Sequence, residues 1–224
     1  MHEGVGQVRS GRALPPELFV PTPGAVRAGT PNMERHVAIL KGFGVPVVVA
    51  INSLDGDSPE EHRVIAEAAK RAGASDAVVS THFAEGGKGA ETLAKAVLDA
   101  AEREPASWEP LYELSDSAEK KVERVATRIY GAASVSWSDS ARSELARISG
   151  TPAAEFPVCI AKTWASLSHD PAMLGAPSGF VFPVREVRIL SGAGFLLAIA
   201  GETQTMPGLP GDRPFPESVY LPTE

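Results

Sequence analysis

Cysteine is almost absent from this sequence: Cys159 is the only one in 224 residues. A disulfide within the chain is therefore impossible, which removes one signature of secreted proteins. The sequence also has no signal peptide and no apolar run of the length that a membrane-spanning helix needs. Together these absences favour a cytoplasmic protein.

Basic residues are in the minority, and they form no cluster. Lys and Arg total 21 against 28 Asp and Glu, so the net charge is -7. This balance argues against a nucleic-acid or anionic-membrane surface. The five histidines are scattered without metal-site spacing, so we predict no metal centre. With 43% hydrophobic and 22% charged residues, the chain can form one large domain or two small ones.

An unbroken apolar, largely β-branched run from Val47 to Ile51 is the most informative stretch of the chain. It is too short for a buried helix, and it predicts a strand covered on both faces, central in a parallel sheet. A helix starting at Pro31 and ending before Gly44 leads into it. Ser58-Pro59-Glu60-Glu61 combines a capping serine, a proline and a glutamate, which predicts a helix start. A second strand is expected over Asp76 to Ser80, completing a βαβ unit.

Beyond this unit the pattern changes, and we place a domain boundary near Pro105. A third helix begins near Gly89, with Leu93, Ala94, Val97, Leu98 and Ala101 as its expected buried stripe. We divide the chain into an irregular segment (1–31), an α/β portion (32–105) and a smaller carboxyl-terminal α+β domain (106–224). In that last domain the sequence predicts helices over 117–130 and 138–148, and strands over 157–161, 180–189 and 195–200.

Two loops follow the two strands of the βαβ unit, and ligands of α/β proteins bind at this edge. If the chain stays extended from Asp76 to Phe83, then Val79, Thr81 and Phe83 point to one face. Leu54 would approach from the other loop, so that a flat ring could bind between an aromatic and an aliphatic side chain. The alternative is that Leu54 and Phe83 are ordinary core residues.

A glycine-rich segment, Gly86-Gly87-Lys88-Gly89, lies in the second loop. It is not a Walker A phosphate loop, because Gly89 intervenes after Lys88 and Ala90 does not provide the magnesium-binding hydroxyl. The backbone N-H groups of Gly86 and Gly87, with Lys88, form either a weak anion site or a structural turn.

Two other polar features of the sequence have structural interpretations. We expect Asp57 to tighten the turn into the next helix, and we expect the segment from Lys162 to Asp170 to form a hydrogen-bonded loop.

Four long segments resemble, in this order, the carboxyl-terminal part of formate-tetrahydrofolate ligase, also called 10-formyltetrahydrofolate synthetase. They are NMERHVAILKGFGVPVVVAIN, THFAEGGKGAETLAKAV, FPVCIAKTWASLSHDP and GAGFLLAIAGETQTMPGLP. The resemblance runs from about Asn32 to Pro210. It implies a P-loop NTPase-like α/β fold and a role in one-carbon metabolism, the ATP-dependent formylation of tetrahydrofolate to 10-formyltetrahydrofolate.

The same resemblance implies a site for the pterin ring of tetrahydrofolate. It places Phe83 and Leu54 at the stacking positions, Asp55 where a proline is usual, and Val79 beside them. The ATP loop and the Mg²⁺ ligands belong to the family's amino-terminal portion, so we expect this truncated chain to be inactive alone. Its expected partners are that portion or further copies of the chain in a homo-oligomer. The alternative is a non-catalytic module for folate binding or subunit association.

Overall fold

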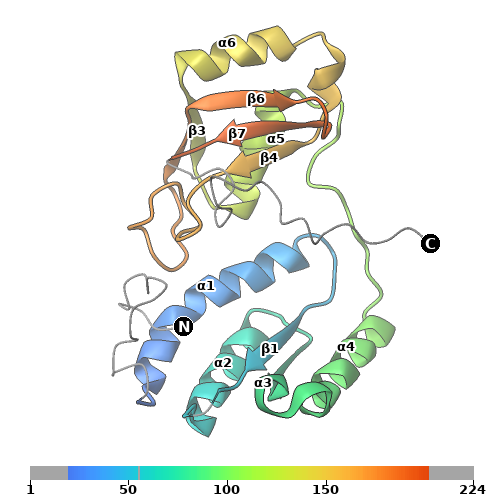
Figure 1. Cartoon of the computed structure of the whole chain (residues 1–224), viewed down its shortest axis with the longest axis vertical. Helices are drawn as coiled ribbons and strands as arrows, with labels where there is room; N and C mark the ends of the chain where they lie inside the picture. Colours follow the sequence, from blue (N-terminus) through green and yellow to red (C-terminus); the bar gives the residue numbers. More distant parts are fainter. Residues whose placement is uncertain (1–19, 55, 202–224) are drawn as a thin grey trace, which may run out of the picture.

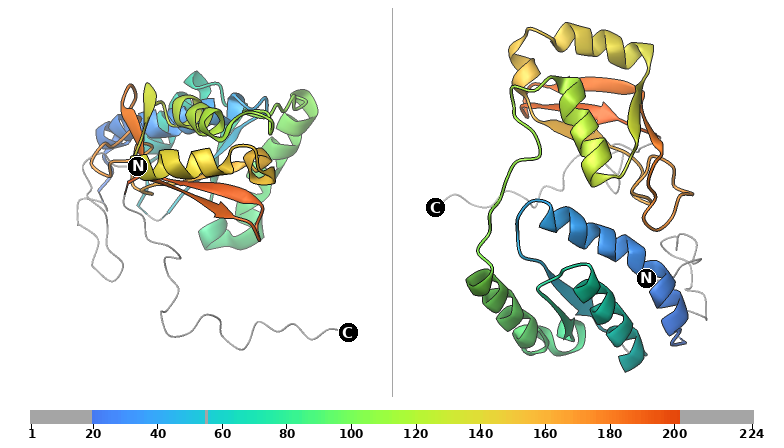
Figure 2. Two further views of the ribbon diagram at one scale, coloured as in Figure 1. Left: turned by 90° about the horizontal axis from the view of Figure 1, so that it is seen from above. Right: turned by 180° about the vertical axis from the view of Figure 1, so that it is seen from behind.

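The computed structural model describes residues 20–54 and 56–201, which form two lobes (Figure 1). The segment between Arg103 and Ala118 has no helix or strand, and it links the lobes covalently, as the view from behind in Figure 2 shows. Helix α1 (Pro23–Lys41) lies on the side of the first lobe that faces the second. Among the described helices, none combines the length and apolar character needed to cross a bilayer.

The first lobe is built on the predicted βαβ unit. Strand β1 (Val48–Asn52) and strand β2 (Asp76–Ser80) pair in parallel, with Val48 opposite Asp76 and Asn52 opposite Ser80. Helix α2 (Pro59–Arg71) connects them and packs on both. Helix α4 (Glu91–Arg103) also contacts both strands, after a short helix α3 (His82–Glu85) and a 3-10 turn η2 (Gly86–Ala90).

Strand β1 does not lie centrally within the described part of the chain, contrary to the prediction. Its only strand partner there is β2. Val47 and Ile51 are buried, whereas Ala50, whose position alternates with theirs along the strand, is exposed. An apolar run predicts which faces of a strand can be buried. The number of strands that pair with it depends on which other strands are present in the sheet.

Helix α1 begins eight residues before the predicted start and carries Pro31 in its interior. Proline has no N-H group, so the carbonyl of Arg27, four residues earlier, loses its helical donor. The hydroxyl of Thr30 donates to this carbonyl at 3.0 Å. The side chain of Thr30 therefore replaces the missing backbone hydrogen bond, and the proline is accommodated within the helix. The irregular segment predicted for 1–31 is wrong from Pro23 onward, and residues 1–19 lie outside the described part.

The start of α2 confirms the predicted capping box. The hydroxyl of Ser58 accepts from the N-H of Glu61 at 3.3 Å, and the Glu61 carboxylate accepts from the N-H of Ser58 at 3.0 Å. The other carboxylate oxygen of Glu61 accepts from the N-H of Thr22 at 2.7 Å. One buried glutamate therefore fixes the starts of both α1 and α2.

We expect Ser58→Ala to lower the free energy of unfolding by about 1 kcal/mol, because it removes one half of the capping box. Ser143→Ala, on the exposed face of helix α6 (Asp139–Ile148), is the matched control and should change stability by less than about 0.5 kcal/mol. Chemical denaturation monitored by circular dichroism measures both. Equal stabilities for the two variants would contradict the structural role of the cap.

The second lobe contains helices α5 (Ala118–Arg124) and α6 (Asp139–Ile148), and α5 continues as a π-helical turn η3 (Val125–Ile129). Both predicted helices are confirmed. Its two sheets have the orders β3-β5 and β4-β7-β6. Their strands are β3 (Ser134–Trp137), β4 (Val158–Ala161), β5 (Val181–Val184), β6 (Glu186–Leu190) and β7 (Phe195–Ile199).

Two features of these sheets were not predicted. The expected strand over 180–189 is divided at Arg185 between the two sheets, and β3 was missed. The pairs β3-β5 and β4-β7 are parallel, and only β6-β7 is antiparallel. The lobe is therefore a mixed structure with small parallel sheets, which the label α+β does not convey. Apolar patterning shows where strands form, but partner choice depends on contacts between distant segments.

The core of the second lobe includes one charged residue. Phe182, Val184 and Leu196 are fully buried, and so is Lys121. The ammonium group of Lys121 donates to the carbonyls of Ala154 at 2.7 Å and Phe156 at 3.0 Å. This lysine therefore ties α5 to the segment that leads into β4.

Candidate functional site

The carboxyl ends of β1 and β2 lie side by side, as the βαβ prediction requires. Asn52 is opposite Ser80, and the N-H of Ser53 donates to the Ser80 carbonyl at 3.0 Å. The chain leaves this edge through two loops that carry Leu54 and Phe83. Relative exposures are 51% for Leu54, 78% for Phe83 and 39% for Val79. These side chains are open to a ligand, and the alternative that Leu54 and Phe83 are core residues is wrong.

Phe83 does not continue the strand alternation from Val79. Strand β2 ends at Ser80, and the N-H groups of Ala84 and Glu85 both bond to the Thr81 carbonyl. The Thr81 hydroxyl also donates to the Glu85 carboxylate at 2.6 Å. The expected extended conformation through Phe83 is therefore wrong, because a helical turn closes directly after the strand. Phe83 is presented by α3 beside the strand end.

The turn after β1 confirms the predicted role of Asp57. Its carboxylate accepts from the N-H of Leu54 at 2.9 Å, and its own N-H donates to the Leu54 carbonyl at 3.2 Å. Asp57 also lies 3.8 Å from the ring nitrogen Nε2 of His62. These contacts hold the backbone of Leu54 at the sheet edge. Asp55, the other residue implied at this site, lies outside the described residues.

The glycine-rich segment is exposed and forms the 3-10 turn η2. The carbonyl of Gly89 accepts from the N-H of Thr81 at 3.1 Å and from the hydroxyl of Ser80 at 3.3 Å. A Cβ atom at Gly89 would lie 2.5 Å from the carbonyl carbon of Thr81. Gly89 is therefore required for the loop to close around α3. Anion binding by Gly86, Gly87 and Lys88 stays a prediction.

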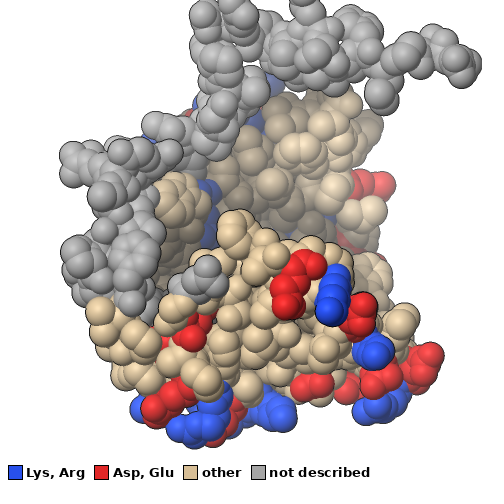
Figure 3. Space-filling model, turned by 60° about the horizontal axis from the view of Figure 1, so that its bottom comes forward, with Lys and Arg blue, Asp and Glu red and all other residues tan. Residues whose placement is uncertain are grey.

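Helix α4 leaves apolar side chains uncovered. Ala96 and Ala100 are its buried residues, whereas Val97 and Leu98 are exposed. The predicted buried stripe is thus wrong at these two positions and at Ala94 and Ala101, which are also exposed, while Leu93 is half-buried. Figure 3 shows the underside of the molecule, where acidic and basic residues are interspersed around an uncharged area. Exposed apolar side chains on a helix indicate a surface that another partner can cover.

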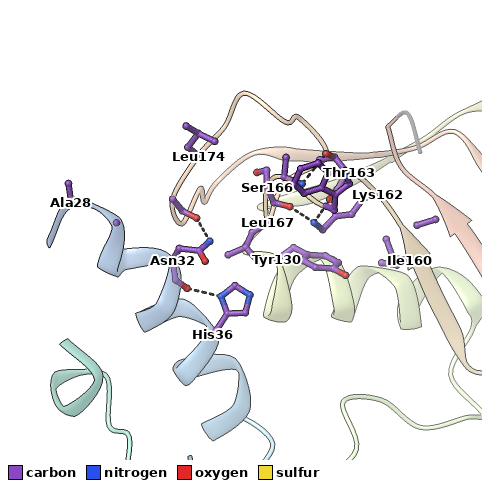
Figure 4. A pocket seen from close by; sticks show the side chains of 15 residues that line it. Ala28, Asn32, His36, Tyr130, Ile160, Lys162, Thr163, Ser166, Leu167 and Leu174 are labelled. Carbon is purple, nitrogen blue, oxygen red and sulfur yellow. Dashed lines mark hydrogen bonds between the residues drawn. The ribbon is translucent and has the colours of Figure 1, made fainter. Parts of the chain in front are cut away.

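A second candidate site is a cavity of about 710 Å³ between α1 and the second lobe (Figure 4). Ala28, Asn32 and His36 line it from α1, and the opposite wall is formed by Tyr130 and the segment 160–167. The Asn32 amide donates to the carbonyl of Gly175 at 2.8 Å. Arg35, on the same helix, donates to the carbonyls of residues 128 and 129 at 3.0 and 3.1 Å. These bonds join the two lobes at the cavity.

Lys162 is the central polar group of this cavity. Its ammonium group donates to the carbonyls of Thr163, at 3.0 Å, and Ser166, and lies 4.8 Å from the centroid of the Tyr130 ring. Burial lowers the pKa of Lys162. The predicted hydrogen-bonded loop is confirmed, since the hydroxyls of Ser166 and Ser168 lie 3.0 Å apart and both bond to the backbone. No pattern in the sequence indicated that this loop also lines a cavity.

Comparisons with known proteins place the whole chain in one family. The family model for formate-tetrahydrofolate ligase matches residues 1–221. The chain is 46% identical over 208 residues to formate-tetrahydrofolate ligase of Herpetosiphon aurantiacus, covering 93% of this chain and 36% of that protein. It is 43% identical over 224 residues to the ligase of Chloroflexus aurantiacus, covering the whole chain and 39% of that protein.

A further relative is the mitochondrial C-1-tetrahydrofolate synthase of Saccharomyces cerevisiae. It is 44% identical over 208 residues, which are 93% of this chain and 21% of that protein. The chain therefore belongs to the formate-tetrahydrofolate ligase family. It spans well under half the length of each of these relatives.

Proposed function

We propose that this chain supplies the folate-binding part of a formate-tetrahydrofolate ligase, corresponding to the carboxyl-terminal portion of the family. The observation that carries the proposal is the exposure of Phe83 and Leu54 on adjacent loops at the carboxyl edge of two parallel strands. An aromatic ring and an aliphatic side chain, both accessible, are what a flat pterin needs for stacking. Asp57 adds to this by fixing the backbone at Leu54.

The polar surroundings of Phe83 suit the rim of a heterocycle. Thr81 and Glu85 lie one helical turn apart and share a hydrogen bond, and the hydroxyl of Ser80 lies 2.9 Å from Nδ1 of His82. A pterin carries ring N-H groups and an amino group. These groups donate hydrogen bonds, which carboxylate and hydroxyl oxygens can accept. We propose that Glu85 exchanges its bond with Thr81 for one with the ligand, while the Phe83 ring covers the pterin face.

The reaction needs groups that this part of the family does not supply. Formate, tetrahydrofolate and ATP with Mg²⁺ are the substrates implied by the family. Phosphate groups of ATP need a glycine-rich loop with a lysine and a magnesium-binding hydroxyl. No G-x-x-x-x-G-K-[ST] motif occurs in the 224 residues. We therefore assign ATP binding to the portion of the family that this chain does not match, and folate binding to this chain.

We expect Phe83→Ala to weaken binding of a tetrahydrofolate analogue by on the order of 1 kcal/mol or more, through lost stacking and contact area. Isothermal titration calorimetry on the whole chain measures it. Leu98→Ala removes an exposed apolar side chain of α4 and serves as the matched control, with unchanged affinity expected. Phe83→Trp should bind at least as well as the parent, and Leu54→Phe should bind more tightly.

An unchanged affinity in Phe83→Ala would place the pterin elsewhere, provided that the variant keeps the parent's circular dichroism spectrum. A double variant, Phe83→Trp with Leu54→Phe, sharpens the result. If both side chains contact one ring, their effects should not add, because each changes the position that the other contacts. Additive effects would mean that the two side chains do not share a ligand.

A second candidate function, subunit association, rests on the exposed apolar side chains of α4. Val97 and Leu98 would be covered either by the portion of the ligase family that this chain does not match or by another copy of the chain. Sedimentation velocity across a wide concentration range separates the two functions. Self-association that Leu98→Ala abolishes, together with no folate binding, would favour association over ligand binding.

A further inference from the structure

The cavity between α1 and the second lobe contains a lysine, Lys162, that has no acidic neighbour among the described residues lining the cavity. Of the described residues that line it, Lys162 and His36 are the ones able to carry a positive charge, and none is Asp or Glu. Within the described part of the chain, the ammonium group of Lys162 donates to two backbone carbonyls, which are neutral. Charged groups withdrawn from water are normally paired, because their desolvation is costly. The lowered pKa of Lys162 reflects this cost.

The ammonium group also keeps one donor for a ligand. It has three N-H groups, and two of them serve the carbonyls of Thr163 and Ser166. These two bonds, with the Tyr130 ring beside them, hold the ammonium group in one position. A fixed, partly desolvated cation with a free donor favours an anionic oxygen more than a mobile surface lysine does.

The other lining groups indicate an organic anion rather than a simple ion. Trp164 lines the cavity and is 83% exposed, so its indole face is open to a flat ring. Nδ1 of His36 is engaged by the carbonyl of Asn32 at 2.7 Å, which leaves Nε2 for a ligand. A volume of about 710 Å³ is within the range of pockets that hold drug-sized molecules.

We propose that this cavity binds an organic anion, with its carboxylate or phosphate on Lys162 and its planar ring on Trp164. The site goes beyond the proposed pterin site, because none of its lining residues belongs to the loops that carry Leu54 and Phe83. A nucleoside monophosphate and an aromatic carboxylate share this chemistry. The two kinds of ligand differ in the anionic group, a tetrahedral phosphate or a planar carboxylate. The experiment below compares one ligand of each kind.

Titration of the whole chain with AMP and with 4-aminobenzoylglutamate, followed by calorimetry, tests the proposal. Adenosine is the matched uncharged probe for AMP. We expect at least one anion to bind at least tenfold more tightly than adenosine, because only the anions reach Lys162 with a charge. Preference for AMP would identify a phosphate site, and preference for 4-aminobenzoylglutamate a carboxylate site.

Variants assign the binding to this cavity. Lys162→Met should weaken anion binding about tenfold or more, whereas Lys70→Met, at an exposed lysine of α2, should leave it unchanged. Trp164→Ala should weaken it about fivefold or more, with Trp108→Ala as the control at another exposed indole. Because Trp164 is so exposed, its replacement should not disturb folding, so it tests the site even if Lys162→Met unfolds.

Two results would overturn the proposal. One is that neither anion binds more tightly than adenosine. The other is that Trp164→Ala, or a folded Lys162→Met, binds the anion as the parent does, in which case Lys162 serves only to hold its loop. Phe83→Ala separates this site from the pterin site. It should leave anion binding unchanged whether or not it weakens folate binding, so failure of one proposal is distinguishable from failure of the other.

Discussion

Lys121→Ala is expected to destabilise the second lobe by about 3 kcal/mol or more, since two partly buried carbonyls lose their donor, at about 1 kcal/mol each, and a buried side chain is truncated. The side chain has 0% exposure, and its four methylene groups fill space in the core. Truncation therefore adds a cavity to the two unpaired carbonyls of Ala154 and Phe156. Such a loss is a large fraction of the stability of an ordinary domain.

Lys120 provides the control, because it is the neighbouring residue and has the same chemistry. Its ammonium group pairs with Asp116 at 2.5 Å, but its side chain is half exposed. Exposed ion pairs contribute little, so Lys120→Ala should cost less than about 1 kcal/mol. Urea denaturation followed by tryptophan fluorescence compares the two variants. Similar losses from Lys120→Ala and Lys121→Ala would contradict the burial of Lys121.

The pH dependence of stability gives a second readout for Lys121. Burial is the largest effect on its pKa and lowers it in the folded chain. Between the lowered folded pKa and the ordinary unfolded value, the unfolded state binds more protons. The parent should therefore gain stability as pH rises through that interval. In Lys121→Met this gain should be absent, and the difference between the two proteins isolates the lysine from other titrating groups.

The purified chain is expected to form no detectable 10-formyltetrahydrofolate from formate, ATP and tetrahydrofolate. The physical reason is charge: the transferred phosphoryl group needs a lysine, backbone N-H groups and Mg²⁺ around it. The nearest candidate in this sequence, Gly86 to Gly89, is an exposed 3-10 turn in which Gly89 replaces the magnesium-binding hydroxyl. Without these groups we expect the purified chain to have no ligase activity.

Chromatographic detection of the product, with the ligase of Herpetosiphon aurantiacus as the positive control, measures this prediction. The parts of that ligase that this chain does not match, added in trans, provide the complementary test. Turnover that appears only on addition would support the division of roles between ATP binding and folate binding. Formate-dependent turnover by the purified chain alone would contradict it.

The sequence predicted local structure well where short-range rules decide it. Ser58 and Glu61 are three residues apart, and their capping box forms as predicted because it needs no distant contact. The parallel pairing of β1 and β2 also follows, since a helix between two strands favours a parallel crossover. Prediction was poorer at α1, where Pro31 normally marks a helix boundary, but Thr30 replaces the lost hydrogen bond.

The residues of the candidate pterin site stay a prediction, and the extended geometry predicted for Phe83 is wrong. Strand alternation placed Phe83 in one row with Val79, whereas the bonds from Thr81 to the residues of α3 end the alternation at Ser80. Whether a segment stays extended depends on local hydrogen bonds that compete with the strand. The exposure of Leu54 and Phe83 could not be read from the sequence either, because burial depends on the neighbours that a fold supplies.

By itself, the sequence determined the βαβ unit, the capping box of its helix α2 and the resemblance to formate-tetrahydrofolate ligase. Only the tertiary structure decided that Lys121 is a buried core residue and that Lys162 stands in a cavity. Both are lysines in polar segments, where a solvated side chain is the usual expectation. Contacts with distant segments determine the environment of both side chains. Lys121 bonds to carbonyls more than thirty residues away, and Lys162 faces a helix more than a hundred residues earlier. Contacts between such distant segments form only when the whole chain packs. Local sequence patterns therefore do not predict them.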